Sequence, residues 1–258
     1  MRLRRGFSAR ANVRYRILIT ILTVALIVTF VFSISIGRFS IPADQIIAVL
    51  LGRQEGISLN IVSVLVNSRI PRAIAAVFSG MALASAGAAY QGVFQNPLAA
   101  PDVLGAASGS ACGAALAILA GFTDIGVQIC AFAMGLASVA LTYLVSKIVG
   151  NKGSMIVYLV LVGMVISAFF DSGISIAKTF ADVDDTLPAI TFWLMGGLTN
   201  VTQKSVAIMA PIIAVGVIAL IFIRWKLNLI SFDDNEAASM GMNVKAMRLL
   251  VVCLATLI

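Results

Sequence analysis

The sequence has no histidine, and only 11% of its 258 residues are charged. Soluble domains carry roughly a quarter charged residues, so this composition excludes an ordinary water-soluble globule. The three cysteines, Cys112, Cys130 and Cys253, lie inside apolar stretches, where a thiol behaves as a small hydrophobic side chain. Without histidine or a cysteine pair, the chain implies neither a disulfide framework nor a soft-metal site.

Hydrophobic residues make up 60% of the chain, and they cluster in long runs. A helix needs about 20 apolar residues to cross a bilayer core. Six runs predict an all-α integral membrane protein with six transmembrane helices, at residues 17–36, 73–94, 103–123, 125–146, 154–177 and 205–223. A seventh run starts at Leu249 and reaches only Ile258, which predicts an incomplete span and a chain truncated at its C-terminus.

Positive charge is distributed unevenly around these runs. Six arginines precede the first run: Arg2, Arg4, Arg5, Arg10, Arg14 and Arg16. The positive-inside rule therefore places the N-terminus in the cytoplasm. With these arginines included, 12 Lys and Arg fall on the predicted inner side and 6 on the outer side. The net charge of +7 thus fits a multi-pass protein of the cell membrane, and no nucleic-acid partner is expected.

Small residues repeat at helical spacing in two of the predicted spans. Every fourth residue is small at positions 80, 84 and 88, and again at positions 105, 109 and 113. Such stripes let helix backbones approach closely, so we expect both to pack within one bundle. The alternative is that a stripe lines a pathway.

Residues 95–102 connect the second and third predicted spans and contain Pro97 and Pro101. Proline removes a backbone donor and ends a helix, so these residues predict a defined turn on the cytoplasmic face. The turn has no Lys or Arg and directly precedes a glycine-striped helix. It is either a simple helix connector or a gate.

Asp171 is the one ionisable residue inside a predicted span. An acid at membrane depth is costly enough to suggest a function. Because Asp171 lies near the outer end of its span, it either reaches the interface or caps a helix break, or it serves an ion-gradient-driven secondary transporter. Beyond it, Asp182, Asp184 and Asp185 predict a solvated acidic loop.

Residues 227–248 are polar, yet they carry helix signals. Ser231 and the aspartates after it are cap residues, Glu236 falls in a first turn, and Gly241 is a typical helix stop. A second short helix can begin at Val244. The segment therefore predicts two brief helices on the cytoplasmic face, against the alternative of an ordinary loop.

Motifs along nearly the whole chain resemble those of FecCD-type permeases, the membrane subunits of ABC importers for iron–siderophore complexes, haem and cobalamin. The most specific is QGVFQNPLAAPDVLG at residues 91–105. SRIPR at 68–72, WLMGGL at 193–198 and the Glu-Ala-Ala of 236–238 followed by Gly241 add to it in the family's order. The resemblance implies a polytopic helical bundle of the BtuC/FecCD-type permease fold.

The resemblance also implies roles for individual residues. Arg69 and Arg72 match arginines that meet acidic residues of the substrate-binding protein. Asn96, Pro97 and Leu98 match positions that close the cytoplasmic end of the pathway. The residues that match the ATPase-coupling element are Asp233, Asp234, Glu236, Ala237, Ala238 and Gly241.

By this resemblance the chain is a transport subunit and not an enzyme. It contains no Gly-x-x-x-x-Gly-Lys-Ser/Thr loop for phosphate, so a separate ATP-binding subunit is expected to hydrolyse ATP. The other expected partners are a periplasmic or lipid-anchored substrate-binding protein, a second permease chain in a homo- or heterodimer, and membrane lipids. No cofactor or metal site is expected.

The resemblance implies import of a ferric siderophore, or of a haem or cobalamin-type chelate. Bare Fe(III) is a hard cation that prefers oxygen ligands, and the spans offer no set of them, so iron is expected to travel inside its chelator. The predicted organisation is a cytoplasmic segment at 1–16, six transmembrane helices within 17–226, coupling helices at 227–248 and the start of a seventh span at 249–258.

Overall fold

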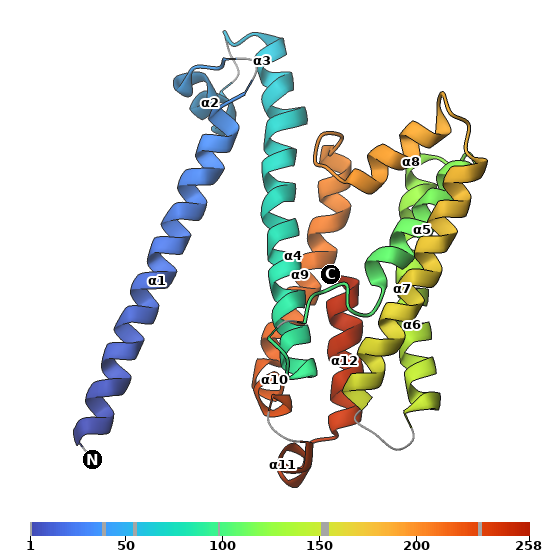
Figure 1. Cartoon of the computed structure of the whole chain (residues 1–258). Coiled ribbons are helices and arrows are strands. Elements are labelled where there is room, and N and C mark those ends of the chain that lie inside the picture. The colour runs from blue at the N-terminus through green and yellow to red at the C-terminus, as the bar shows by residue number, and fades with distance from the viewer. Residues whose placement is uncertain (1, 38–39, 54–55, 98, 151–154, 232–233) are drawn as a thin grey trace. The chain divides into compact units, whose positions relative to one another are not determined.

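The computed structural model describes residues 2–37, 40–53, 56–97, 99–150, 155–231 and 234–258 (Figure 1). All secondary-structure elements in this described part are helices, as the apolar runs predict. The chain divides into two compact units. The first comprises Met1–Val77 and Thr199–Ala207, and the second comprises Phe78–Leu198 and Ile208–Ile258.

The first unit is built around the long helix α1 (Arg2–Ser35). It also contains α2 (Ala43–Leu50), α3 (Leu59–Val64), the π-helical turn η1 (Leu65–Arg69) and the first residues of α4 (Ile70–Phe94). Apolar side chains stay exposed along α1, as for Phe32 at 62%. An apolar helix surface of this kind suits contact with lipid.

A π-helical turn joins α3 to α4, and Pro71 explains its position. Proline has no N–H, and its ring clashes with the carbonyl four residues earlier, here that of Asn67. The helix therefore widens, and the Ile70 N–H donates to the Leu65 carbonyl five residues back. Arg69 is the last residue of this turn.

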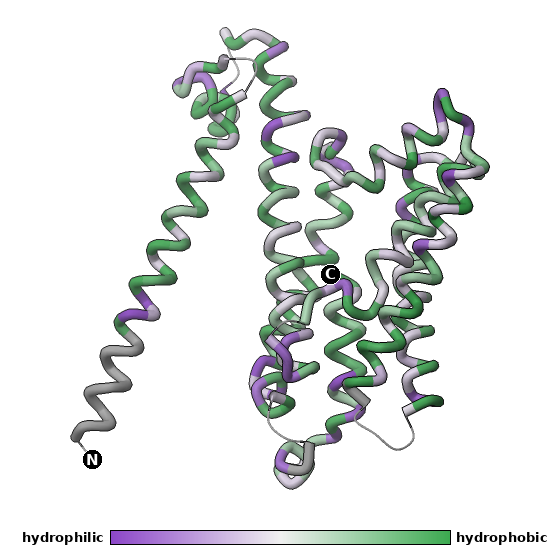
Figure 2. The backbone as a smooth tube through the Cα atoms, in the orientation of Figure 1, coloured by the Kyte–Doolittle hydropathy of each residue, from purple (hydrophilic) through white to green (hydrophobic). Residues whose placement is uncertain are grey.

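The second unit contains the rest of α4 and of α9 (Gln203–Phe222), and a body of helices further along the chain. Its other elements are α5 (Ala106–Leu119), α6 (Asp124–Val149), α7 (Met155–Phe180), α8 (Thr186–Met195), α10 (Arg224–Ile230), α11 (Asp234–Ser239) and α12 (Val244–Leu257). Figure 1 shows α5, α6 and α7 packed together. Apolar residues dominate the middle of these helices, and hydrophilic ones gather at the ends (Figure 2).

The glycine stripe of α5 is tightly packed, as predicted. A Cβ built on Gly109 would lie 2.5 Å from the Ser138 Cβ, and one on Gly113 would lie 2.5 Å from the Cys130 carbonyl. Only glycine permits this approach of α5 to α6. The buried Ser138 hydroxyl also donates to the Gly105 carbonyl at 2.7 Å, which fixes the start of α5.

The stripe on α4 differs. Gly80, Ala84 and Ala88 are exposed, and no atom of the described residues lies within 4 Å of a Cβ built on Gly80. The prediction of packing inside one bundle is therefore wrong for this stripe within the described chain. The spacing is the same as in α5, but no helix of the second unit covers it.

A second core joins the end of α4 to α12. Tyr90, Val93 and Val251 are at most 1% exposed and belong to one cluster of buried residues. The Tyr90 and Thr256 hydroxyls are hydrogen-bonded at 2.9 Å. The short helix expected from Val244 and the incomplete span expected from Leu249 are one continuous helix, and that helix is anchored in this core.

Within the described residues, five helices are long and apolar enough to cross a membrane: Val13–Ser35, Leu59–Phe94, Asp124–Val149, Val157–Phe180 and Gln203–Phe222. The remaining predicted span, at 103–123, corresponds to the 14-residue helix α5. Gly105 and Gly121 take positive φ values of 79° and 72° on either side of it. Such a helix extends about 21 Å, less than the roughly 30 Å of a bilayer core, so this crossing stays a prediction.

Candidate functional site

The second unit contains the predicted turn after α4. Gln95 follows the last residue of α4 and has φ of 50°, alone among the described non-glycine residues in having a positive value. Such a conformation is unusual for a residue with a Cβ. The Asn96 N–H donates back to the Gln91 carbonyl at 3.2 Å, and the Ala99 N–H donates to the Asn96 carbonyl at 3.1 Å. The chain thus turns where Pro97 predicts, while Leu98 lies outside the described residues.

One side chain links this turn to α10. The Gln95 Nε2 donates to the Ile230 carbonyl at 2.9 Å. Ile230 is the last residue of α10, where carbonyls have no partner within their own helix. α4 also lies close to α10 at Gly92, since a Cβ built there would be 3.6 Å from the Ser231 Oγ and 4.0 Å from the Leu227 carbonyl. The sequence contains little signal for this role of Gln95. It shows only a single amide side chain between an apolar helix and an Asn-Pro turn.

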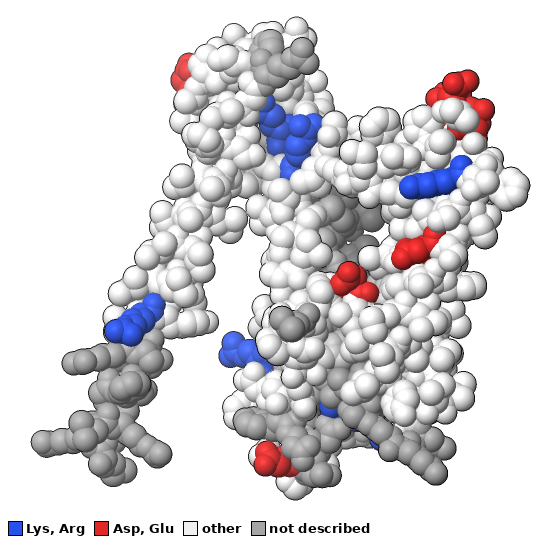
Figure 3. All heavy atoms as spheres, viewed as in Figure 1, with Lys and Arg blue, Asp and Glu red and all other residues white. Residues whose placement is uncertain are grey.

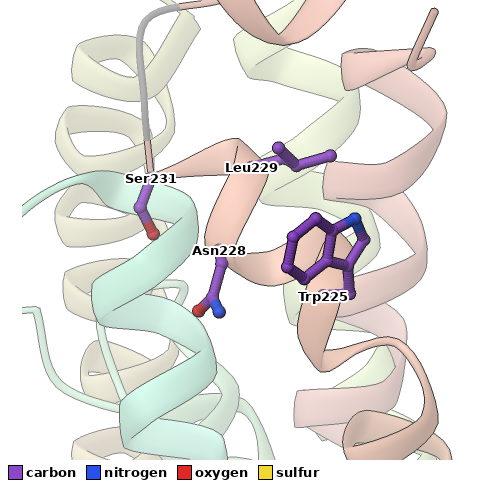
Figure 4. A pocket seen from close by; sticks show the side chains of 4 residues that line it. All are labelled: Trp225, Asn228, Leu229 and Ser231. Atoms are coloured by element: carbon purple, nitrogen blue, oxygen red, sulfur yellow. The ribbon is translucent and has the colours of Figure 1, made fainter. Parts of the chain in front are cut away.

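The surface of α10 has an open pocket of about 440 Å³. Figure 4 shows Trp225 and Leu229 on one side of the segment and Ser231 on the other, with Asn228 between them. Trp225 is 72% exposed, and its neighbours Arg224 and Lys226 are exposed too. Exposed tryptophan beside cations is typical of a membrane–water interface, so α10 fits the boundary between α9 and the polar segment.

The polar segment contains a short helix, α11, that ends at the predicted stop. Gly241 has φ of 80°, and its N–H donates to the Ala238 carbonyl at 2.9 Å, which ends α11. The Asn243 side chain accepts a hydrogen bond from the Ala246 N–H at 3.1 Å and begins α12. Asp233 lies outside the described residues, and of Asp234 only the backbone is described.

Helix α11 has a buried side and an exposed side. Ala237 is 1% exposed, whereas Glu236, Ala238 and Met240 are exposed. The buried alanine lets the short helix lie close to its neighbours α10 and α12. The exposed acid and small residues are then available to a partner.

Arg69 and Arg72 lie in the first unit and differ in environment. The half-buried Arg69 donates through Nη1 to the carbonyls of Ile34 at 2.8 Å and Ser35 at 3.1 Å, at the C-terminus of α1. A cation is stabilising there because the last carbonyls of a helix carry partial negative charge. Arg72 is exposed, and its Nη2 donates to the Thr199 carbonyl at 3.0 Å.

Both arginines line an open pocket of about 410 Å³ in the first unit. The remaining lining residues are Ser33, Ile36, Gly37, Val64 and Ser68, none of which is acidic. Arg69 holds the end of α1 through two hydrogen bonds, whereas Arg72 is the more exposed of the two side chains. The sequence pattern treats the two alike, and the structure separates them.

The remaining predicted features are also found in the second unit. Asp171 lies on an exposed face of α7. α8 ends at Met195, and Gly196 and Gly197 take φ values of 69° and 155° in the predicted Trp-x-x-Gly-Gly turn. In the described residues, no three acidic or cysteine side chains gather as a metal site.

These features define a multi-pass helical membrane protein in which the turn after α4 is hydrogen-bonded to the end of α10, next to the short polar helix α11. Residues 25–258 match the model of the FecCD transport family, and the chain belongs to that family. It is therefore the permease of an ABC importer, and the family assignment sets aside an ion-gradient-driven secondary transporter.

Its relatives include permeases with different named substrates. The chain is 35% identical to the molybdate import system permease protein MolB of Haemophilus influenzae, over 91% of this chain and 69% of that protein. It is 31% identical to the Fe(3+)-citrate import system permease protein YfmE of Bacillus subtilis, over 95% of this chain and 72% of that protein.

A solved structure has the same fold. It is "an inward-facing conformation of a putative metal-chelate type ABC transporter", with a TM-score of 0.83 and 31% sequence identity. The match covers 94% of this chain and 73% of that one. The expected fold is thus confirmed.

Proposed function

We propose that this permease carries a ferric siderophore, or a haem or cobalamin-type chelate, from a substrate-binding protein to the cytoplasm. A separate ATPase subunit drives the step, and a second permease chain completes the pathway. The relatives named for iron chelates support this cargo, although one relative is named for molybdate. Among the described residues no three acidic side chains gather as hard oxygen ligands for bare Fe(III), which favours a chelate as the transported species.

The proposed topology follows the charge pattern. Residues 1–16 lie in the cytoplasm, 17–226 hold six crossings, 227–248 couple to the ATPase, and 249–258 belong to a further crossing. The six arginines before residue 17 support this orientation. The interfacial character of α10 supports a boundary near residue 227.

The observation that carries the proposal is the hydrogen bond between Gln95 and Ile230. The ATPase would bind the coupling element, formed by Asp233, Asp234, Glu236, Ala237, Ala238 and Gly241. A movement of that element pulls on the end of α10, and Gln95 passes it to Asn96, Pro97 and Leu98, which close the pathway. The chain thereby acts by conformational coupling and makes or breaks no covalent bond.

At the other side of the membrane, the binding protein would dock on the face that carries Arg69 and Arg72. Charge complementarity there steers association and fixes register more than it adds affinity. Arg72 supplies the contact, since it is the more exposed of the two. Arg69 keeps the end of α1 in place for it.

The two arginines can be separated by charge reversal. Arg72→Glu is expected to weaken binding-protein docking about tenfold at low salt, because attraction becomes repulsion, and to leave the amount of folded permease unchanged. Arg69→Glu is expected to lower the thermal stability of the permease as well, since it removes the cap on α1. Docking affinity measured across salt concentrations checks this, and an unaltered affinity for Arg72→Glu would refute the docking role.

The ATPase assignment is tested by co-purification. The permease is co-expressed with ATPase subunits from the same genome, as wild type, Gly241→Trp and Gly241→Asn. Tryptophan is strained at a φ of 80°, whereas asparagine tolerates it, and no described atom crowds a Cβ at this position. We expect the ATPase to be recovered with wild type and Gly241→Asn and lost with Gly241→Trp, with membrane insertion intact in all three. If no ATPase is recovered with any folded variant, the proposal is wrong.

A further inference from the structure

One face of α7 is polar over half of its length. Asp171, Ser172, Ser175 and Thr179 are all exposed, and they follow one another on one side of the helix. At about 1.5 Å per residue, Asp171 lies roughly 13 Å from the helix end at Phe180, within the apolar segment Val157–Phe180. This depth is too great for the carboxylate to count as part of the end loop.

The hydroxyl groups on this face direct their hydrogens to the backbone. Ser172, Ser175 and Thr179 donate to the carbonyls four residues earlier, at 2.8, 3.0 and 2.9 Å. Their oxygen lone pairs then face outward together with the Asp171 carboxylate. The face therefore offers hydrogen-bond acceptors and one negative charge, which water satisfies and lipid does not.

The other half of the same face is apolar. Leu161, Met164 and Val165 are 49%, 56% and 68% exposed. The change from apolar to polar occurs partway along the helix, near Ala168. A lipid-facing helix carries scattered hydroxyl groups but no charge, as α1 does from Ile17 to Ser35, and a helix in an open pore would be polar throughout. The half-and-half pattern indicates water that enters from one end only.

Acidic residues dominate that end of the second unit. Asp182, Asp184 and Asp185 are exposed in the loop that follows α7, and Asp124 is exposed at the start of α6. Figure 3 shows acidic atoms gathered at this tip. Lys178 on α7 carries the opposite charge, but acids still outnumber bases among the described residues of this end. Several like charges around an aqueous entrance sum to a field that repels anions.

We propose that the Asp171 face of α7 lines a water-filled vestibule, and that Asp171 makes the vestibule favour neutral or cationic chelates over anions, both free oxyanions such as molybdate and anionic ferric chelates. This deepens the proposed function and rests on it for the identity of the cargo. Asp171 acts here as a specificity-determining residue. This role requires no ion gradient, because the charge of Asp171 acts only through the electrostatic potential that it creates in the vestibule.

Thiol labelling tests both parts of the proposal. Ser175→Cys is introduced after Cys112, Cys130 and Cys253 are changed to alanine, in the permease with its partner subunits in native membranes. Two methanethiosulfonate reagents of similar size serve as probes, one with a trimethylammonium group and one with a sulfonate. Their rates are divided by those for a small free thiol, which removes intrinsic reactivity.

We expect Ser175→Cys to react with both reagents and faster with the cation. Asp171→Asn should lower the cation-to-anion ratio about tenfold, since one unit charge at 5–7 Å in water changes each rate by about threefold in opposite directions. Asp171→Glu should keep the ratio. Val165→Cys is the matched control: Val165 is 68% exposed in the apolar half of the same face, and its thiol should react with neither reagent.

Two results would overturn the proposal. If Ser175→Cys is as unreactive as Val165→Cys, then lipid or protein covers the face and no vestibule exists. If the ratio is the same with Asp171→Asn, another group sets the field. Labelling requires neither ATP hydrolysis nor transport. A failed co-purification would thus refute the ATPase assignment and leave the vestibule proposal standing. An unreactive Ser175→Cys would refute the vestibule and leave the ATPase assignment standing.

Discussion

Two helices of this permease carry the same spacing of small residues in opposite environments. In α5, Gly109 and Gly113 touch α6 so closely that a methyl group would not fit. In α4, Gly80 and its small neighbours face away from the described chain of the second unit. A stripe of small residues thus shows that a helix can be approached closely. Whether another helix packs against it is decided by the surrounding structure.

The difference also separates a fixed part from a movable part. The α5–α6–α7 body is joined by glycine contacts and buried hydroxyl bonds, such as Thr142 to the Leu104 carbonyl at 3.0 Å. The end of α4 is joined to α10 by apolar packing around Leu227 and by an amide hydrogen bond from Gln95. Tightly packed interiors resist small displacements, whereas one hydrogen bond can break and re-form. We therefore expect changes in α5 to affect folding and changes at the end of α4 to affect coupling.

The largest effect is expected for Gly109→Leu. Its side chain would enter space held by the Ser138 Cβ and by the Met134 carbonyl, which is 2.8 Å from a Cβ built on Gly109. Overpacking costs about 1–3 kcal/mol or more, so folded protein in the membrane should fall severely. Yield after detergent extraction and thermal unfolding measure this. Gly109→Ala should lie between Gly109→Leu and wild type, and normal stability of Gly109→Leu would show that the α5–α6 contact is looser than the structure has it.

An intermediate effect is expected for Gln95→Glu. Glutamate has nearly the same shape but cannot donate to the Ile230 carbonyl when ionised. A hydrogen bond contributes about 1 kcal/mol, or roughly fivefold in an equilibrium, so ATP hydrolysed per substrate imported should rise severalfold. Reconstituted permease with its partners provides this ratio.

Gln95→Gly serves as the control for backbone strain. Glycine accepts the φ of 50° freely, so this variant removes the amide without straining the turn. It should be as poorly coupled as Gln95→Glu and at least as stable as wild type. A wild-type ratio in both variants would mean that the coupling element reaches the gate by another route.

The smallest effect on folding is expected for Gly80→Leu. Its side chain meets no described atom within 4 Å, and surface substitutions usually change stability by less than about 0.5 kcal/mol. Thermal unfolding of the extracted permease should match wild type. A large loss of stability would show that the two stripes do not differ after all.

Much of this architecture can be predicted from the sequence. Long apolar runs need no tertiary information, because lipid requires helices of a certain length. Cap residues such as Asn243 and the helix stop at Gly241 act within one turn of chain, so their effects are local as well. The turn at Pro97 follows from the missing N–H of proline.

The roles of Gln95 and of the two arginines could not be predicted in this way. Gln95 meets the Ile230 carbonyl 135 positions later in the chain, and Arg69 meets the Ile34 carbonyl 35 positions earlier. Such bonds depend on where distant helices end, and a motif match treats Arg69 and Arg72 as equals. Likewise, α5 is shorter than its apolar run because flanking glycines adopt left-handed conformations.

The sequence by itself determined that this protein is helical, lies in a membrane and belongs among FecCD-type permeases, because hydropathy, caps and local motifs act over short stretches of chain. The tertiary structure decided which glycines are packed, which arginine holds a helix end, and which amide joins the turn to α10. Those outcomes depend on contacts between segments far apart in the chain, whose energies exist only once the helices are side by side.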